Sequence, residues 1–330
     1  MDKKLKRLLT FGAAAAAGYG AAKLLSFVMA KNLVDLAMDR TPPAAGELER
    51  IKNRFDVPDD ANALHKRLAE ATLALESAPH ETVEISAADG EKLVGHWFGC
   101  ENAKRVIVAM HGWRSSWCAD FGVIAPFWHS EGCSVLYAEQ RGQNNSGGDY
   151  MGFGITERYD CLEWVKWVNA RCGADTPVYL AGVSMGATTV LLAAGLELPG
   201  NVRGIMADCG FTSARDIWKH VVEKNLHLAY GPIGALANDI CRQKINTGAD
   251  ECSTLDAMES CRVPVLFIHG EADRLVPVEM TLENYEHCAA PKRLLTVPGA
   301  DHGMSYVVDE AGYQRVLREF WAEYDAPGES

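Results

Sequence analysis

The sequence has no basic patch outside its first residues, no Cys-x-x-Cys pair, and no histidine and cysteine cluster with zinc-site spacing. The chain has 32 basic and 44 acidic residues and a formal net charge of −12. This charge, together with the lack of a basic patch, argues against nucleic acid as a partner. The missing cysteine and histidine spacing predicts no metal site, and no motif requires a cofactor. No internal repeat interrupts the 330 residues, of which 48% are hydrophobic, enough for one large core.

Cysteine is present but scattered. Several of the 10 cysteines lie in apolar runs, such as Cys133 before the segment SVLYAE. This placement favours buried, reduced thiols, which are typical of a reducing compartment.

The N-terminus carries a different signal. The basic segment MDKKLKR precedes a long apolar run from Leu8 to Ala30, which Lys23 interrupts. A basic segment before an apolar run is typical of a signal anchor, although alanine is only weakly hydrophobic. We expect membrane association through residues 8–30. The alternatives are a helix packed on the protein, which leaves a cytoplasmic location open, and a cleaved signal. A spanning helix would place the main domain outside, where ten cysteines fit poorly.

Three regions follow from the pattern along the chain: an anchor candidate (1–40), a linker and helix (41–80) and a main domain (81–330). In the main domain, short apolar runs alternate with helical segments. Such alternation predicts an α/β fold with a mostly parallel sheet and helices on both faces. About fifty residues, near 211–262, are too many for a plain connection and predict a small helical cap.

The segment VYLAGVSMGATTVLL indicates chemistry. A strand-like run ends at Gly182, Ser184 follows between two glycines, and a helical run begins after Gly186. Strand, Gly-x-Ser-x-Gly and helix together form a nucleophile elbow, which exposes a serine hydroxyl on a tight turn. Ser184 is therefore the candidate nucleophile.

A serine nucleophile needs a base, and the base needs an acid to orient it. Asp273 follows one apolar strand and His302 follows the next, in the chain order Ser, Asp, His that suits this elbow. Both candidates lie on loops at the carboxyl ends of strands, where Ser184 also emerges. Four nearby residues compete for these roles. Asp208 is a minor alternative acid, Glu271 is a near neighbour of the acid, Asp301 is expected to orient the loop, and His269 is expected to be structural.

An acyl-transfer intermediate also needs two fixed donors for its oxyanion. The sequence predicts the N–H of Met185, directly after the nucleophile, and the N–H of Trp113, in the loop after the third strand. His111 and Gly112 are expected to shape that loop. The side chains of Trp113, Trp218 and Tyr230 are expected to contact an apolar substrate group.

Taken together, the motifs HGW, GVSMGA, ADCGFTS, PVLFIHGEADRLVP and GADHGMSY resemble the α/β-hydrolase superfamily. They are most similar to bacterial N-terminally anchored hydrolases of the serine-aminopeptidase-like and prolyl-oligopeptidase-like groups. The resemblance runs from about Val83 to the C-terminus. It implies the α/β-hydrolase fold, the triad Ser184, Asp273 and His302, and the oxyanion donors Trp113 and Met185.

The motifs leave the substrate open. The leading hypothesis is a serine hydrolase that cleaves a small or medium carboxylic ester through an acyl-enzyme. The alternative is a serine peptidase, in which Glu223, Asp239 or Glu251 of the cap would hold a free amino terminus. A catalytically idle binding protein at a membrane is the third possibility.

Overall fold

The computed structural model describes residues 22–41 and 61–325. They form a single eight-stranded sheet with the strand order β1-β2-β4-β3-β5-β6-β7-β8. The strands are β1 (Glu81–Ser86), β2 (Lys92–Phe98), β3 (Arg105–Met110), β4 (Cys133–Glu139), β5 (Val178–Val183), β6 (Val202–Asp208), β7 (Val265–Gly270) and β8 (Lys292–Val297). β2 pairs antiparallel with both β1 and β4, and the other neighbours are parallel.

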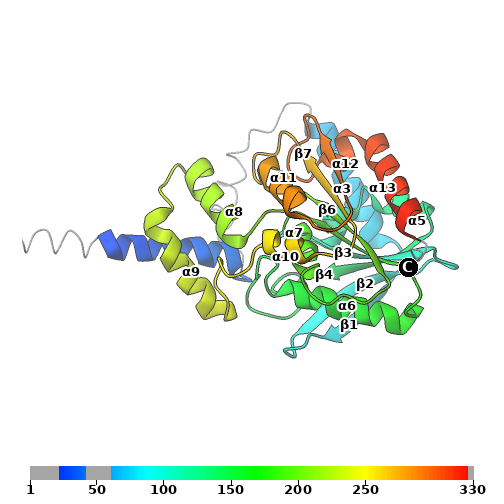
Figure 1. Ribbon diagram of the computed structural model, residues 1–330, viewed down its shortest axis with the longest axis horizontal. Coiled ribbons are helices and arrows are strands. Elements are labelled where there is room, and N and C mark those ends of the chain that lie inside the picture. Colours follow the sequence, from blue (N-terminus) through cyan, green and yellow to red (C-terminus); the bar gives the residue numbers. More distant parts are fainter. Residues whose placement is uncertain (1–21, 42–60, 326–330) are drawn as a thin grey trace, which may run out of the picture.

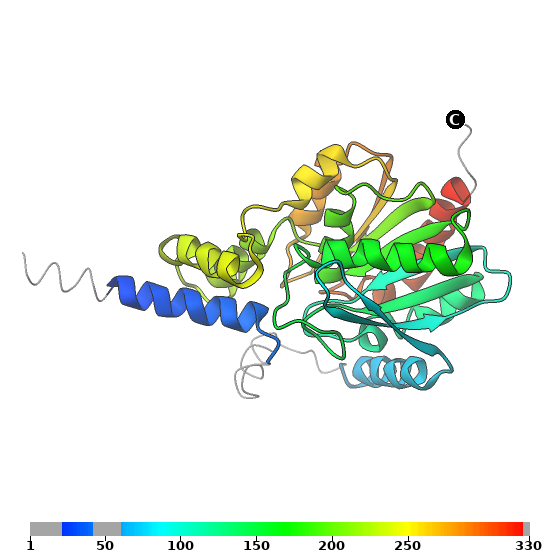
Figure 2. The same ribbon diagram turned by 90° about the horizontal axis from the view of Figure 1, so that it is seen from below.

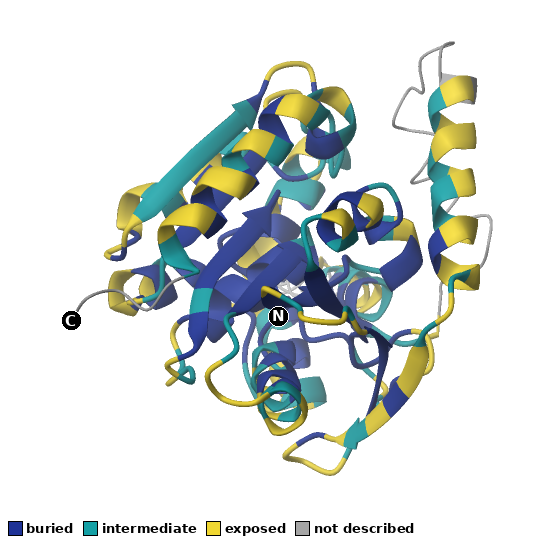
Figure 3. Cartoon of the chain, turned by 90° about the vertical axis from the view of Figure 1, so that its right-hand side faces the viewer, coloured by how far each residue is buried: buried dark blue, intermediate teal, exposed yellow. Residues whose placement is uncertain are grey.

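Helices cover both faces of the sheet, as the alternation of apolar runs predicts (Figure 1). One face carries α6 (Glu157–Cys172), α7 (Met185–Ala193), α10 (Thr254–Ser260) and α11 (Val278–His287). The other carries α3 (Ala61–Ser77), α4 (Trp117–Phe121), α5 (Ala125–Ser130), α12 (Ser305–Val308) and α13 (Glu310–Tyr324). The central strands are buried on both faces and lie between helices with exposed outer faces (Figure 3). This explains why β3 and β5 are continuous apolar runs in the sequence.

The cap consists mainly of α8 (Ala214–His220), the π-helix η1 (Val221–Asn225) and α9 (Gly231–Ile245). These elements lie beside the sheet, whereas α10, inside the expected cap range, packs on α7 and α11 (Figure 1). The cap begins where β6 ends, so it stands at the carboxyl edge of the sheet.

A helix over residues 22–38 lies along the cap, next to α9 (Figure 2). Its second half is buried: Ala30, Val34, Ala37 and Met38 join the core that the cap helices form. Its first half is exposed, with Leu24 at 65% and Leu25 at 60% exposure. Within the described residues, no helix has both the length and the apolar character needed to cross a bilayer. The first part of the anchor candidate, residues 8–21, and most of the 41–60 linker lie outside the described residues.

The burial of this helix sets where the chain can be shortened. The sequence suggests that a chain beginning near Arg40 keeps its fold and activity, because all candidate catalytic residues lie beyond it. That expectation stays a prediction, and the structure argues against so late a start, because Ala30, Val34, Ala37 and Met38 pack in the cap core. A chain beginning at Arg40 would expose the apolar surface that they cover, so a shortened chain should begin before Ala30.

Met38, 1% exposed, provides a direct test. Met38→Ala should lower the free energy of unfolding by about 2–5 kcal/mol, because it removes buried methylenes and leaves a cavity. The control Leu24→Ala, on the exposed half of the same helix, should change it by about 0.5 kcal/mol or less. Urea denaturation measures both, and equal midpoints for the two variants would show that the helix does not pack on the cap in solution.

Candidate active site

Ser184 lies on a strained turn between β5 and α7. Its backbone has φ 56° and ψ −118°, in a region that residues with a side chain rarely adopt. The turn is close-packed: a Cβ on Gly186 would lie 1.8 Å from the Met110 carbonyl oxygen, and one on Gly182 would lie 2.2 Å from the Gly186 oxygen. Both flanking positions therefore require glycine. The Ser184 N–H donates to the Asp208 carbonyl oxygen over 2.9 Å, which helps to hold the turn.

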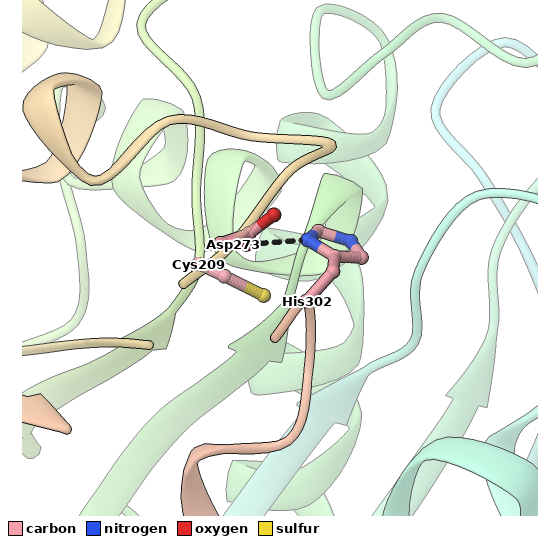
Figure 4. Close-up of side chains that lie close together, drawn as sticks. All are labelled: Cys209, Asp273 and His302. Carbon is pink, nitrogen blue, oxygen red and sulfur yellow. Dashed lines mark hydrogen bonds and ion pairs between the residues drawn. The ribbon is translucent and has the colours of Figure 1, made fainter. Parts of the chain in front are cut away.

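The structure brings Ser184, His302 and Asp273 together. His302 Nε2 lies 2.9 Å from Ser184 Oγ, and His302 Nδ1 lies 2.7 Å from Asp273 Oδ2. Figure 4 shows the contact between His302 and Asp273, with Cys209 beside it. Asp273 follows β7 and His302 follows β8, so both come from loops at the carboxyl edge where the elbow also emerges. These distances place the three groups within reach for proton transfer from the serine.

The charges around this relay favour an imidazolium. Burial would raise the pKa of Asp273, but hydrogen bonds from His269 and His302 outweigh it and hold that pKa below its usual range. Burial of the His302 ring favours its neutral form, but the ionised Asp273 carboxylate that contacts the ring outweighs this effect and holds the pKa of His302 well above its usual value. An ionised Asp273 can therefore stabilise the positive charge that His302 gains when it takes the serine proton.

The competing acids have other partners. Asp208 is buried at the end of β6 and accepts a hydrogen bond from Ser305 Oγ at 3.0 Å. Asp301 pairs with Arg274 at 2.6 Å and accepts the His302 backbone N–H at 2.8 Å, so it orients the loop, as expected. Glu271 accepts from Thr296 on β8. None of the three forms a side-chain hydrogen bond with the His302 ring, which is paired with Asp273.

His269 supports Asp273 in a way that the sequence did not reveal. Its Nε2 lies 2.9 Å from the Val276 oxygen and 3.2 Å from Asp273 Oδ2, and because both are acceptors, Nε2 is the donor. Its Nδ1 lies 2.7 Å from Thr281 Oγ1. The other carboxylate oxygen of Asp273 accepts two backbone N–H groups, those of Leu275 and Val276. The only sequence signal was a histidine four positions before the acid, which equally suits a packed core residue.

Of the two predicted oxyanion donors, Met185 directly follows Ser184, and Trp113 follows Gly112, whose backbone approaches the Ser184 side chain. Neither N–H has an acceptor among the described residues. Met185 is the first residue of α7, where N–H groups lack an intrahelical partner. Trp113 N–H belongs to the peptide whose carbonyl, on Gly112, accepts from His111 Nδ1 at 2.8 Å. Because a trans peptide directs its C=O and N–H to opposite sides, this hydrogen bond fixes the direction of the Trp113 N–H.

Two further contacts stabilise this loop from inside. Burial lowers the pKa of His111, so the ring is neutral, and its Nε2 accepts the Gln140 N–H at 3.1 Å. The Asp120 carboxylate accepts the Gly112 N–H at 2.5 Å, so the Gly112 N–H is not free to act as a donor.

Comparisons with known proteins identify the family and the fold. The sequence pattern of the prolyl oligopeptidase family matches residues 119–325, more than half of the chain. The chain belongs to the prolyl oligopeptidase family. It has the α/β-hydrolase fold that its motifs predict.

Two bacterial relatives are uncharacterized proteins. YqkD of Bacillus subtilis is 29% identical over 189 residues, which are 57% of this chain and 62% of the relative. The match to this chain thus spans less than two thirds of the length of YqkD. YfhR of Escherichia coli K12 is 24% identical over 230 residues, which are 67% of this chain and 73% of the relative.

Solved structures show the same fold. The Pyrococcus furiosus esterase Pf2001 superimposes with a TM-score of 0.63 at 23% identity, over 76% of this chain and 93% of the esterase. Est1E of Butyrivibrio proteoclasticus superimposes with a TM-score of 0.58 at 20% identity, over 74% of this chain and 100% of Est1E. The Pyrococcus horikoshii acylaminoacyl peptidase superimposes with a TM-score of 0.57 at 16% identity, over 78% of this chain and 44% of the peptidase. Esterases and a peptidase therefore share the fold of this prolyl oligopeptidase-family member.

The N-terminal helix reaches the candidate oxyanion loop of this family member. The Trp113 indole Nε1 donates to the Ala37 carbonyl oxygen at 2.7 Å. The Arg114 guanidinium donates to the carbonyl oxygens of Leu36 at 2.9 Å and Asp39 at 2.6 Å. Carbonyl groups at a helix end lack intrahelical hydrogen-bond partners. These bonds therefore supply donors to those carbonyls and also hold the loop that carries Trp113 against the helix.

A cavity of about 330 Å³ opens at Ser184 and is also lined by Trp113 and His302. The structure does not bring Trp218 and Tyr230 to this cavity. They are 3% and 5% exposed and lie in the cap core that the N-terminal helix completes. The sequence identified them as apolar cap residues but could not show that the helix over residues 22–38 buries that side of the cap.

One group of potential metal ligands lies within the described residues: Cys209, Asp273 and His302, whose ligand atoms are within 4.8 Å of one another. The His302 Nδ1 is engaged with Asp273 (Figure 4). Burial raises the pKa of the Cys209 thiol to about 11, so it stays protonated near neutral pH, whereas metals bind the thiolate. These groups therefore fit a proton relay better than a metal centre.

The relay predicts a pH dependence. His302 must be neutral to accept the serine proton, so kcat/KM should rise with pH through the pKa of His302. Because that pKa is raised, the rise should lie above the ordinary histidine value of about 6.5. Asp273→Asn should lower kcat about 10³ to 10⁴-fold and move the rise to lower pH, because the charge that stabilises the imidazolium is lost. Asp208→Asn is the matched control and should have a much smaller effect. A larger loss in folded Asp208→Asn would identify Asp208 as the acid.

Proposed function

We propose that the protein hydrolyses carboxylic esters through an acyl-enzyme on Ser184. The observation that carries the proposal is the relay from Ser184 Oγ through His302 to Asp273 at the mouth of a mainly apolar cavity. In this mechanism, His302 Nε2 takes the serine proton as the hydroxyl attacks the acyl carbon. The N–H groups of Trp113 and Met185 stabilise the oxyanion, and His302 then protonates the leaving alcohol. Water, activated by His302, releases the acid and restores Ser184.

The carboxylates favour an ester over a peptide with a free amino terminus. An aminopeptidase needs an unpaired acid to bind the ammonium group. The cavity is lined by Asp120 and Asp208, and both carboxylates accept hydrogen bonds from the protein. The acids that the sequence offered, Glu223, Asp239 and Glu251, do not line the cavity, and the last two pair with Arg242.

Ser184→Ala should abolish ester hydrolysis and labelling by a fluorophosphonate, with a loss of about 10⁴-fold or more. The test compares wild type and variant on p-nitrophenyl esters and on aminoacyl anilides. Unchanged far-UV circular dichroism shows that the variant is folded. If the wild type turns over anilides faster than esters, the result would favour a peptidase. If the fluorophosphonate does not label the wild type, the result would favour a binding protein without catalytic activity. Full activity in Ser184→Ala would contradict the mechanism.

We further propose that the N-terminal segment attaches the enzyme to a membrane. The support is the long apolar run from Leu8 to Ala30, in which Lys23 is the one charged residue, together with the exposed half of the helix, where Leu24, Leu25, Phe27 and Val28 are 44–65% exposed. Apolar burial in lipid is insensitive to salt, whereas binding by a basic patch alone is screened.

Membrane fractionation tests this placement. The full chain should sediment with membranes, resist high salt and be released by detergent, whereas a chain beginning at Met29 should remain in the supernatant with its esterase activity. Release by salt alone would show purely electrostatic attachment. An intact full chain found wholly in the supernatant would contradict the proposal.

A further inference from the structure

The cavity at Ser184 extends away from the cap. It enters the layer between the sheet and the helices α4, α5, α12 and α13. Its floor includes Val183 and Ala181 of β5 and Met206 of β6. Alternate residues of a strand share a face, and a strand rises about 3.3 Å per residue, so the cavity follows β5 for about 10 Å from Ser184.

The inner walls are apolar and well defined. Phe121, Ile124 and Trp128 form one side, and Leu317 of α13 forms part of the other. These four side chains are 6% exposed or less, so they are fixed by the surrounding core. Leu68 of α3 and Val307 of α12 also line the cavity but are only half-buried, which places them nearer its opening.

The charged groups among the lining residues have partners within the protein. Asp120 accepts the Gly112 N–H, Asp208 accepts from Ser305, and the Arg114 guanidinium donates to the end of the N-terminal helix. A ligand in the cavity therefore meets mainly apolar side chains and no unpaired charge. This environment suits a hydrocarbon chain.

We propose that this cavity is an acyl pocket for linear, medium-length acyl chains. The inference rests on the proposed function, because it is the covalent acyl group on Ser184 that would occupy the pocket. The acyl carbon must contact Ser184 Oγ, and the leaving alcohol must face His302 Nε2 to receive a proton. The chain that remains on the enzyme would then extend along β5, while the alcohol leaves toward the solvent.

The volume sets a limit on length. A cavity of about 330 Å³ lies at the small end of ligand sites, which span about 300–1,000 Å³. Each methylene that enters the pocket should raise kcat/KM about fourfold. The gain should stop once the chain reaches the inner walls, so octanoyl esters should react faster than butyryl and palmitoyl esters.

Two substrate series separate the acyl from the alcohol side. The first varies the acyl chain at constant p-nitrophenol, from acetate through butyrate and octanoate to palmitate. The second varies the alcohol at constant acetate, from ethyl through butyl to octyl. The proposal expects an optimum at octanoate in the first series and little change in the second. A flat first series, or an optimum in the second series only, overturns it.

Neighbouring valines of α12 provide a matched pair. Val307 lines the cavity, whereas Val308 is 51% exposed and does not. Val307→Phe should narrow the pocket and lower the octanoate-to-acetate ratio of kcat/KM at least tenfold, and Val308→Phe should leave this ratio unchanged. Ala181→Val provides a second test from the sheet side and should shift the optimum toward butyrate. Equal ratios in the wild type, Val307→Phe and Ala181→Val overturn the proposal.

Phosphonate probes distinguish failure of the pocket from failure of the proposed function. p-Nitrophenyl alkylphosphonates place the alkyl group where the acyl chain would lie, and mass spectrometry identifies the labelled residue. Faster labelling of Ser184 by the octyl than by the butyl probe supports the pocket even if no ester is turned over. Ester turnover with equal labelling rates supports the function and overturns the pocket.

Discussion

The close approach of two backbone segments determines the candidate active site. The Met110 carbonyl at the end of β3 lies so near Gly186 that no side chain fits there, and this contact locks the turn in which Ser184 adopts a positive φ. Strain of this kind persists only where the surroundings over-determine it. Here the end of β3, the Asp208 carbonyl on β6 and the start of α7 all constrain the same residue. The same end of β3 leads directly into the loop that carries Trp113, so one packing contact relates the nucleophile to a proposed oxyanion donor.

Residues whose position follows from strand order could be predicted from the sequence. In a parallel sheet, the carboxyl ends of neighbouring strands meet at one edge, so Ser184, Asp273 and His302 could be expected to meet once β5, β7 and β8 were recognised as strands. The fold class was predictable for the same reason, since buried strands are apolar on both faces.

Residues whose position depends on packing between distant segments could not be predicted in this way. An apolar run looks the same in sequence whether lipid or protein covers it, so the helix over residues 22–38 gave no sign that half of it is buried in the cap. Trp218 and Tyr230 were expected at the substrate because the sequence does not show that the same helix packs against that side of the cap and buries them. The direction of the cavity also depends on how α4, α5 and α13 pack on the sheet, and His269 is distinguished from a core histidine only by its contact with Asp273.

The hydrogen bonds from Trp113 and Arg114 to the end of the N-terminal helix bear on where the functional unit begins. The Trp113 indole and its acceptor on Ala37 are 76 positions apart, and both precede residue 119, where the family similarity starts. A fragment cut at the limits of that similarity would keep Ser184, Asp273 and His302 but lose β1, β2, β3 and the loop that faces the nucleophile. The shared segment thus carries the candidate triad, whereas the segment before it carries the proposed oxyanion donor Trp113 and the helix that contacts its side chain.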